Sequence, residues 1–330
     1  MKKRALLVAA LLVLAAGAGA ASLLAGKGLG AAESWEALAS PRPGTTGYDI
    51  VWRIRLPRLL LGGLVGAGLA ACGAVFQGML RNPLADPFTL GVSGGAALGA
   101  TAVRVLWPGA PAGALPAGAF LGAVLAAGLV HAAAARNRFS ESGLILAGVV
   151  LGFLFSSLVY LLFAWARPSE AQGALLWLMG DLSNPDPRLL QAAALPVLLA
   201  LGALWALSRD LDALTLGDEK AGTLGVSPAR MRQVLFAIAS LATAACVACA
   251  GVVGFVGLLV PHLLRPLAGP GHRFLIPASA LGGAVLLTGS DLFARTATRG
   301  GDLPVGVITG LLGGTLLLGL LLRGKGFRFF

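Results

Sequence analysis

Charged residues are scarce in this chain of 330 residues. Asp, Glu, Lys and Arg together make up 12% of it, about half the share of an average soluble domain, whereas 57% of the residues are hydrophobic. A soluble fold of this length could not hide so much apolar surface, so we expect lipid to surround the chain. The formal net charge of +11 lies in short segments between apolar runs, as in a membrane protein, and does not indicate nucleic-acid binding.

Reactive side chains are also few. The chain holds three His and three Cys, and the CxxC pair of Cys246 and Cys249 invites a redox or metal-binding interpretation. The residues around this pair are apolar and include no His or carboxylate. We therefore interpret these two and Cys72 as small packing residues, and we expect no metal site, disulfide or cofactor.

Motifs for nucleotide binding and catalysis are absent or out of context. No GxxxxGK[ST] sequence occurs, so the chain cannot hold ATP in a P-loop. The residues 91–95 match GxSxG, but a nucleophile elbow needs a preceding strand and a His base, and neither is indicated near Ser93. We expect no enzymatic activity, and any use of ATP and Mg²⁺ would belong to a separate subunit.

Glycine, in contrast, is abundant, with 48 residues, and much of it lies inside apolar runs. Small residues let helices in a membrane approach one another closely, so this composition predicts tight helix packing. The continuous runs exclude the period-two alternation of a membrane barrel. We predict an all-α integral membrane protein that forms one transmembrane domain over 1–330, with ten spans at about 5–25, 57–80, 90–107, 112–135, 143–166, 189–208, 229–252, 254–267, 274–296 and 304–323.

The first apolar run follows Lys2, Lys3 and Arg4 and resembles a signal peptide. It is long enough to cross a bilayer, and more spans follow, so we interpret it as a retained first helix. Ten spans then place both termini in the cytoplasm, and the Lys and Arg residues are biased weakly toward the inner segments. Arg53, Arg55 and Arg58 gather on the outer side, either as interfacial anchors or as a docking patch for an acidic partner; the residues favour neither.

The longest polar inner segment, 208–232, contains glycines and short amphipathic stretches. It suits either two short helices that bind a soluble partner or an ordinary connecting loop. The RNPLADP sequence at 81–87 offers a similar choice, because Pro83 and Pro87 could simply end helices.

An ordered set of motifs resembles the FecCD-type permeases, which import iron-siderophores, haem and vitamin B12. The match covers about 45–320, and its order and spacing make it specific. The motifs are RLPR (55–58), QGMLRNPLADP (77–87), LGVSGGA (90–96), LAGV (146–149), WLMG (177–180), the segment 216–226, GFVGL (254–258), PHLLR (261–265), DLFAR (291–295) and DLPVGV (302–307).

The resemblance implies the type II ABC importer architecture and a bacterial inner-membrane location. A second permease copy, two cytoplasmic ATPase subunits and a periplasmic or lipid-anchored binding protein are the implied partners, besides membrane lipid. The substrate would be a bulky iron chelate, either a siderophore or haem, or cobalamin. The alternative is an ion-coupled secondary transporter, but the spans hold almost no Asp, Glu or His near their midpoints, where such a transporter needs them.

The resemblance also implies roles for particular residues. Arg55, Arg58 and Arg295 correspond to outer arginines that meet glutamates of the binding protein. The coupling segment, 209–228, would contact the ATPase through Leu216, Gly217, Ala221, Leu224, Gly225 and Val226. The cytoplasmic gates would be formed by Asn82, Leu84, Ser140, Glu141 and Ser142.

Overall fold

The computed structural model describes residues 2–136, 138–183, 185–298 and 300–322, and all regular elements in this part of the chain are helices. Each of the ten predicted apolar segments coincides with one helix, which confirms the predicted fold class. These helices are α1 (Lys2–Leu24), α4 (Leu56–Met79), α5 (Val92–Leu106), α6 (Ala114–Arg136), α7 (Glu141–Trp165), α9 (Pro187–Ala206), α12 (Pro228–Ala250), α13 (Val256–Ala268), α14 (His272–Thr296) and α15 (Val305–Leu322).

Length and apolar composition qualify 7 of these helices as candidate membrane spans, α4 together with the residues before it, whereas α5, α13 and α15 are shorter apolar helices. Six further helices connect them. They are α2 (Ala31–Ala39), α3 (Thr46–Tyr48), the π-helical η1 (Asp49–Arg55), α8 (Pro168–Leu178), α10 (Ser208–Thr215) and α11 (Asp218–Thr223). Of the two possibilities for 208–232, the pair of short helices is therefore the one present, while α2 and α8 were not predicted.

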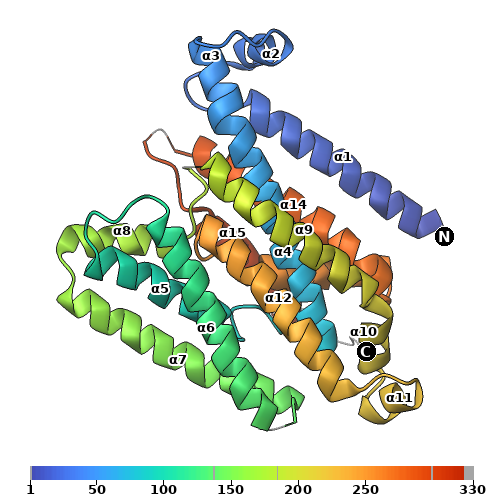
Figure 1. Cartoon of the computed structure of the whole chain (residues 1–330). Coiled ribbons are helices and arrows are strands. Elements are labelled where there is room, and N and C mark those ends of the chain that lie inside the picture. The colour runs from blue at the N-terminus through green and yellow to red at the C-terminus, as the bar shows by residue number, and fades with distance from the viewer. Residues whose placement is uncertain (1, 137, 184, 299, 323–330) are drawn as a thin grey trace.

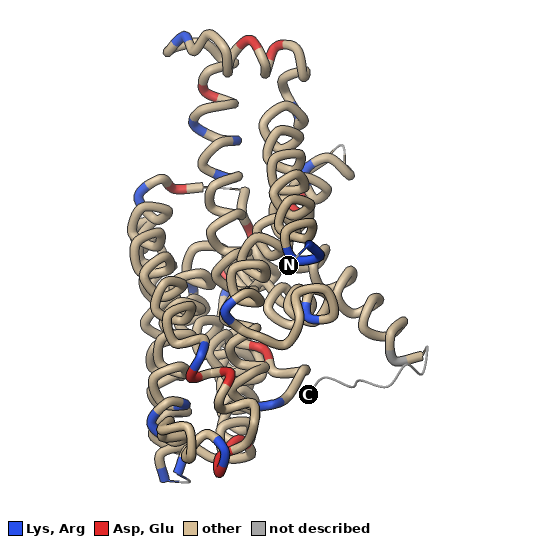
Figure 2. The backbone as a smooth tube through the Cα atoms, turned by 90° about the vertical axis from the view of Figure 1, so that its right-hand side faces the viewer, with Lys and Arg blue, Asp and Glu red and all other residues tan. Residues whose placement is uncertain are grey.

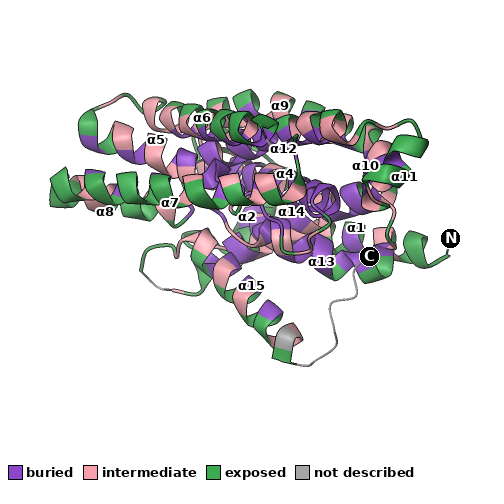
Figure 3. Ribbon diagram, turned by 90° about the horizontal axis from the view of Figure 1, so that it is seen from below, coloured by how far each residue is buried: buried purple, intermediate pink, exposed green. Residues whose placement is uncertain are grey.

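The bundle is built around α4, which is buried along most of its length. α14, α12 and α13 pack against α4. α5 to α8 lie together on one side of the molecule, and α1 lies on the other side (Figure 1). Buried residues gather along α4 and α14, whereas α1, α7 and α15 expose much of their apolar surface (Figure 3). This inverted exposure is expected of helices whose outer faces meet lipid.

Polar contacts sort the connecting segments into two groups at opposite ends of the bundle. Arg4 Nε donates to the carbonyl of Ala268, so the start of α1 lies beside the α13–α14 connection, at the end that also carries α10 and α11; we call this the α11 end. Lys27 binds Asp302 at the other end, called the α2 end. Charged residues concentrate in these segments and the short helices, and the long helices are largely free of them (Figure 2). Charged connections at both ends and apolar helices between them are the pattern that ten consecutive spans predict.

Glycines bring helices into backbone contact. A Cβ atom at Gly66 of α4 would lie 2.2 Å from the carbonyl oxygen of Gly283 in α14, and one at Gly283 would lie 2.1 Å from that of Gly66. Gly99 of α5 and Gly118 of α6 meet in the same way, with 2.0 Å from a Cβ at Gly99 to the Gly118 oxygen. The prediction of close packing by small residues is confirmed.

A short non-helical segment separates two consecutive helices, α12 and α13, inside the bundle. α12 ends at Ala250, and α13 begins only at Val256, next to Gly257, which lies against Gly73 in the half of α4 nearer the α11 end. Two backbone groups at this break have partners, because Asp181 N donates to Ala250 O and Gly251 N donates to Val247 O, both at 2.9 Å. Non-helical backbone inside a membrane is tolerated only where protein or a cavity covers it, and here protein does so.

Candidate functional site

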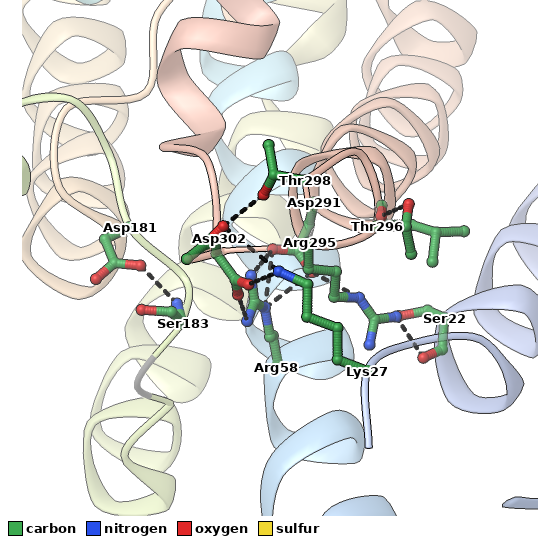
Figure 4. A network of polar contacts seen from close by, with 12 residues as sticks. Ser22, Lys27, Arg58, Asp181, Ser183, Asp291, Arg295, Thr296, Thr298 and Asp302 are labelled. Atoms are coloured by element: carbon green, nitrogen blue, oxygen red, sulfur yellow. Dashed lines mark hydrogen bonds and ion pairs between the residues drawn. The ribbon is translucent and has the colours of Figure 1, made fainter. Parts of the chain in front are cut away.

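A cluster of charges with a buried centre lies at the α2 end, where α4, α14 and the segment before α15 meet (Figure 4). The guanidinium of Arg58 holds Asp291 with two hydrogen bonds from Nε, at 2.9 and 3.0 Å, and its Nη1 donates to Asp302 at 2.7 Å. Lys27 Nζ lies 3.4 Å from the other oxygen of Asp302. Arg58 therefore joins α4 to two acidic residues more than 200 positions further along the chain.

Arg295 lies beside this cluster on α14. Its Nη2 donates to the hydroxyl of Ser22 at 2.8 Å and to the Ser22 carbonyl, while its Nε is 3.8 Å from Asp291. These contacts attach the end of α1 to α14. We call Lys27, Arg58, Asp291, Arg295 and Asp302 the arginine cluster.

Arg55 is held separately by the N-terminal connection. It donates to the carbonyl of Leu23 and to the hydroxyl of Ser34, both at 2.8 Å, and to the carbonyl of Leu29 at 3.2 Å. Arg55 therefore organises the chain between α1 and α2 around its guanidinium.

The three arginines to which the resemblance gives a docking role are thus inside the protein, with exposed fractions of 3% for Arg55, 7% for Arg58 and 6% for Arg295. They line a cavity of about 170 Å³ together with Lys27, Ile50, Ile54 and Asp302. These three side chains therefore form no exposed patch in this conformation, and their contact with a binding protein stays a prediction. Of the three arginines in the RIRLPR stretch, Arg53 is exposed, whereas Arg55 and Arg58 are buried.

The acidic members of the arginine cluster, Asp291 and Asp302, stand in the motifs DLFAR and DLPVGV, which do not by themselves indicate a role for them. Asp302 lies in the segment before α15, outside the spans. Burial alone would raise its pKa, but hydrogen bonds and charges from Arg58 and Lys27 outweigh this, so the pKa of Asp302 is lowered. Asp302 is therefore an ionised partner of Arg58 at neutral pH.

At the α11 end, the predicted coupling residues divide by exposure. Leu216 and Leu224 expose 56% and 62% of their surface, and Gly225 is also exposed, whereas Ala221 is fully buried. Gly217 and Gly225 adopt φ angles of 103° and 83°, which favour glycine. Val226 is half-buried and donates its N–H to the carbonyl of Ala221 at 3.0 Å. Two large apolar side chains thus face away from the protein on either side of α11.

α10 is anchored to the bundle by an interaction that the sequence did not indicate. Asp212 Oδ1 accepts a hydrogen bond from the backbone N–H of His272 at 2.8 Å and lies 2.7 Å from His272 Nδ1. His272 is fully buried. The contact ties α10 to the first turn of α14.

The predicted gate residues organise two turns at the same end. Asn82 Oδ1 accepts from the N–H of Leu84 at 2.9 Å, and Leu84 itself is exposed. Ser140 caps α7 by accepting from Gly143 N at 3.2 Å, and Ser142 is exposed beside it. These contacts agree with turn and cap roles, which are compatible with a gate but do not require one.

Glu141, the remaining gate residue, belongs to an ion cluster. Its Oε1 accepts from Arg81 Nε at 2.6 Å and from Arg232 Nη2 at 2.8 Å. Arg232 in turn binds both carboxylate oxygens of Asp218, at 2.5 and 3.0 Å. Arg81 Nη2 lies 3.9 Å from Asp218. We call Arg81, Glu141, Asp218 and Arg232 the α11 ion cluster.

The hydrogen bonds from Arg232 are the largest influence on Asp218 and lower its pKa. Because the folded pKa lies below the unfolded one, the stabilisation that this carboxylate provides is complete above about pH 4 and is lost as the pH falls through the folded pKa. The cluster is therefore intact at neutral pH.

Arg81 occupies an unusual backbone position. It follows the C-terminus of α4 with φ 44°, and Asn82 N donates to Gln77 O at 3.1 Å while Arg81 N donates to Gly78 O at 3.3 Å. This is the Schellman pattern, in which glycine is the usual residue at the left-handed position. A left-handed conformation costs a residue with a Cβ about 1 kcal/mol, which Arg81 bears while it binds Glu141.

The cysteines remain free, and Cys246 packs against Gly68 of α4. In the part of the chain that the structure describes, no group of three or more His, Cys, Asp or Glu side chains is arranged to hold a metal ion.

Comparison with known proteins gives consistent matches over nearly the whole chain. The model of the FecCD transport family matches residues 7–323. The cobalamin import system permease protein of Halobacterium salinarum is 41% identical over 278 residues, which cover 84% of this chain and 74% of that protein. The Fe(3+) dicitrate transport system permease protein of Escherichia coli is 39% identical, over 88% of this chain and 90% of that protein.

The hemin transport system permease protein of Yersinia pestis is 37% identical, over 85% of this chain and 86% of that protein. Among solved structures, a transporter described as metal-chelate type, in an inward-facing conformation, superposes with a TM-score of 0.84 and 31% identity. That superposition covers 97% of this chain and 99% of the other.

Proposed function

The chain belongs to the FecCD transport family, and on this premise we propose that it is the membrane-spanning permease of an ATP-driven, binding-protein-dependent importer. The proposed substrate is a bulky iron chelate, either a siderophore or haem, with cobalamin as the second candidate. The observation that carries the proposal is the match over residues 7–323, together with relatives named as iron-dicitrate, hemin and cobalamin permeases.

The proposed assembly contains two permease copies, two ATPase subunits and a substrate-binding protein. The α11 end and both termini face the cytoplasm of a bacterium, and the α2 end faces outward. The chain acts as one transmembrane domain without a cofactor of its own. Its work is to be stable in two conformations that open to opposite sides, with ATP shifting the balance between them.

We assign the contact with the ATPase to the exposed side chains around α11. Leu216 and Leu224 present apolar surface, while Gly217, Ala221, Gly225 and Val226 shape the turns that display it. Exposed leucines on either side of a short polar helix suit an apolar cleft of a soluble partner.

For the outer partner, we propose that acidic side chains of the binding protein approach the cavity lined by Arg55, Arg58 and Arg295. Exposed Lys27 and Arg53 would attract them. At the inner end, Asn82, Leu84, Ser140, Glu141 and Ser142 form the proposed gate, on the two connections that precede α5 and α7.

Replacing both Leu216 and Leu224 by Glu is expected to reduce the amount of ATPase that co-purifies with the permease by about tenfold, because two apolar contact residues become charged. The thermal midpoint of the permease alone should hardly change, since both side chains are exposed. Leu106→Glu, at the α2 end of α5, is the control and should retain the ATPase. Equal retention by both variants would remove α11 from the contact.

The proposed function is tested by reconstituting the permease with its ATPase in lipid vesicles and offering binding protein loaded with a ferric siderophore, hemin or cobalamin. We expect ATP-dependent uptake of one of these substrates and an increase of ATP hydrolysis when the loaded binding protein is added. Uptake that follows a proton gradient without ATP would instead establish an ion-coupled transporter and refute the proposal.

A further inference from the structure

Four charged side chains from four separate segments meet at the α11 end. Arg81 follows α4, Glu141 begins α7, Asp218 begins α11, and Arg232 lies near the start of α12. We infer that this α11 ion cluster is the device that transmits movement of α11 to both inner connections, with Arg81 and Arg232 as positioning residues. The inference rests on the proposed function, because it needs an ATPase that moves α11.

The geometry of Arg232 supports this role. Only 3% of its side chain is exposed, and its Nη1 and Nη2 atoms bind Asp218, while Nη2 also binds Glu141. One rigid, planar group therefore fixes the start of α11 relative to the start of α7. Removing one of these carboxylates from the buried Arg232 would destabilise the protein. A displacement of α11 must therefore either move α7 with it or break the cluster.

Arg81 extends the link to the connection between α4 and α5. It shares Glu141 with Arg232, and its Nη1 lies 3.3 Å from the position of a Cβ on Gly217, so its side chain also covers the turn into α11. Asn82 and Leu84, the proposed gate residues of this connection, follow Arg81 directly. The start of α7, the start of α11 and the connection between α4 and α5 thus meet at Glu141 and Asp218.

The backbone of Arg81 makes the role of its side chain open to a direct test. A turn of this kind is most stable with glycine at the left-handed position, yet arginine stands there. From this position the guanidinium of Arg81 donates to Glu141 at 2.6 Å. In the described part of the chain, every ion pair of α11 belongs to this cluster.

This backbone gives an unusually sharp test, since Arg81→Gly improves the turn and removes only the ionic link. In the reconstituted complex with ATPase and loaded binding protein, we expect Arg81→Gly to keep the thermal midpoint and the bound ATPase. The number of ATP molecules hydrolysed per substrate imported should rise roughly tenfold, because the stroke is no longer transmitted. Glu141→Gln should shift the same ratio in the same direction, and Arg81→Lys should restore part of it.

The control is Arg138→Gly at the end of α6. Arg138 is also exposed and left-handed, with φ 52°, and the described residues give it no ion pair, so this variant relieves the same strain and removes the same charge. It should leave the ratio unchanged. A normal ratio in Arg81→Gly, or an equal rise in Arg138→Gly, overturns the inference alone. Absence of ATP-dependent uptake in the unmodified complex refutes the proposed function and the inference together.

Discussion

Gly73→Ala is expected to destabilise the permease by about 3 kcal/mol, although it adds a single methyl group. A Cβ on Gly73 would lie 1.8 Å from the carbonyl oxygen of Gly257 and 2.4 Å from its carbon. Both atoms are backbone, so no side chain can rotate away, and α13 must move away from α4. The measurement is the thermal midpoint and the yield of monodisperse protein in detergent.

Gly63→Ala provides a control on the same helix. A Cβ there meets nothing within 4 Å, so the identical substitution should leave the midpoint unchanged or slightly raised. If Gly73→Ala were as stable as Gly63→Ala, the contact between α4 and the start of α13 would not be as close as described.

Asp291→Ala is expected to cost about 4 kcal/mol, because it leaves the guanidinium of Arg58 buried with one of its two carboxylates missing and deprives Arg295 of its nearest opposite charge. The free energy of unfolding, measured by titration with sodium dodecyl sulfate in mixed micelles, should fall accordingly.

Asp49→Ala is the matched control, because Asp49 pairs with Arg53 at 3.3 Å in an exposed position. Its loss should cost less than about 1 kcal/mol. The double variant Arg58→Met/Asp291→Leu should be more stable than Asp291→Ala, since it buries no unmatched guanidinium at residue 58. Equal losses in Asp291→Ala and Asp49→Ala would mean that the arginine cluster is solvated rather than buried.

The positions of the long helices along the chain could be predicted from the sequence, because lipid surrounds them. Lipid offers no partner for backbone groups, so each apolar run must be a helix, and all ten runs are. Runs such as 5–25 and 143–166 differ from α1 and α7 by only a few residues at either end. The α11 ion cluster could not be predicted in the same way, because Glu141 and Arg232 are 91 positions apart and the apolar pattern does not show which span ends meet.

The burial of Arg55, Arg58 and Arg295 could not be predicted, because it depends on contacts between distant parts of the chain. Their positions at the mouth of the second span and at the end of the ninth indicated the correct end of the bundle. Whether they face inward depends on which side of α4 packs against α14, and on Asp302 folding back over Arg58. Helical periodicity is weak in α4, since the helix is apolar all round, and so it left the orientation of Arg58 open.

The distance along the chain between Arg58 and its carboxylates has a consequence for biosynthesis. Arg58 and Asp291 are separated by 233 positions, and a ribosome needs roughly 10 to 50 s to add that many residues. During this interval Arg58 has no counter-charge from Asp291. Because Arg58 lies in the first turn of α4, its long side chain can keep the guanidinium at the lipid–water interface. We therefore expect Arg58 to become buried only after α14 has been made.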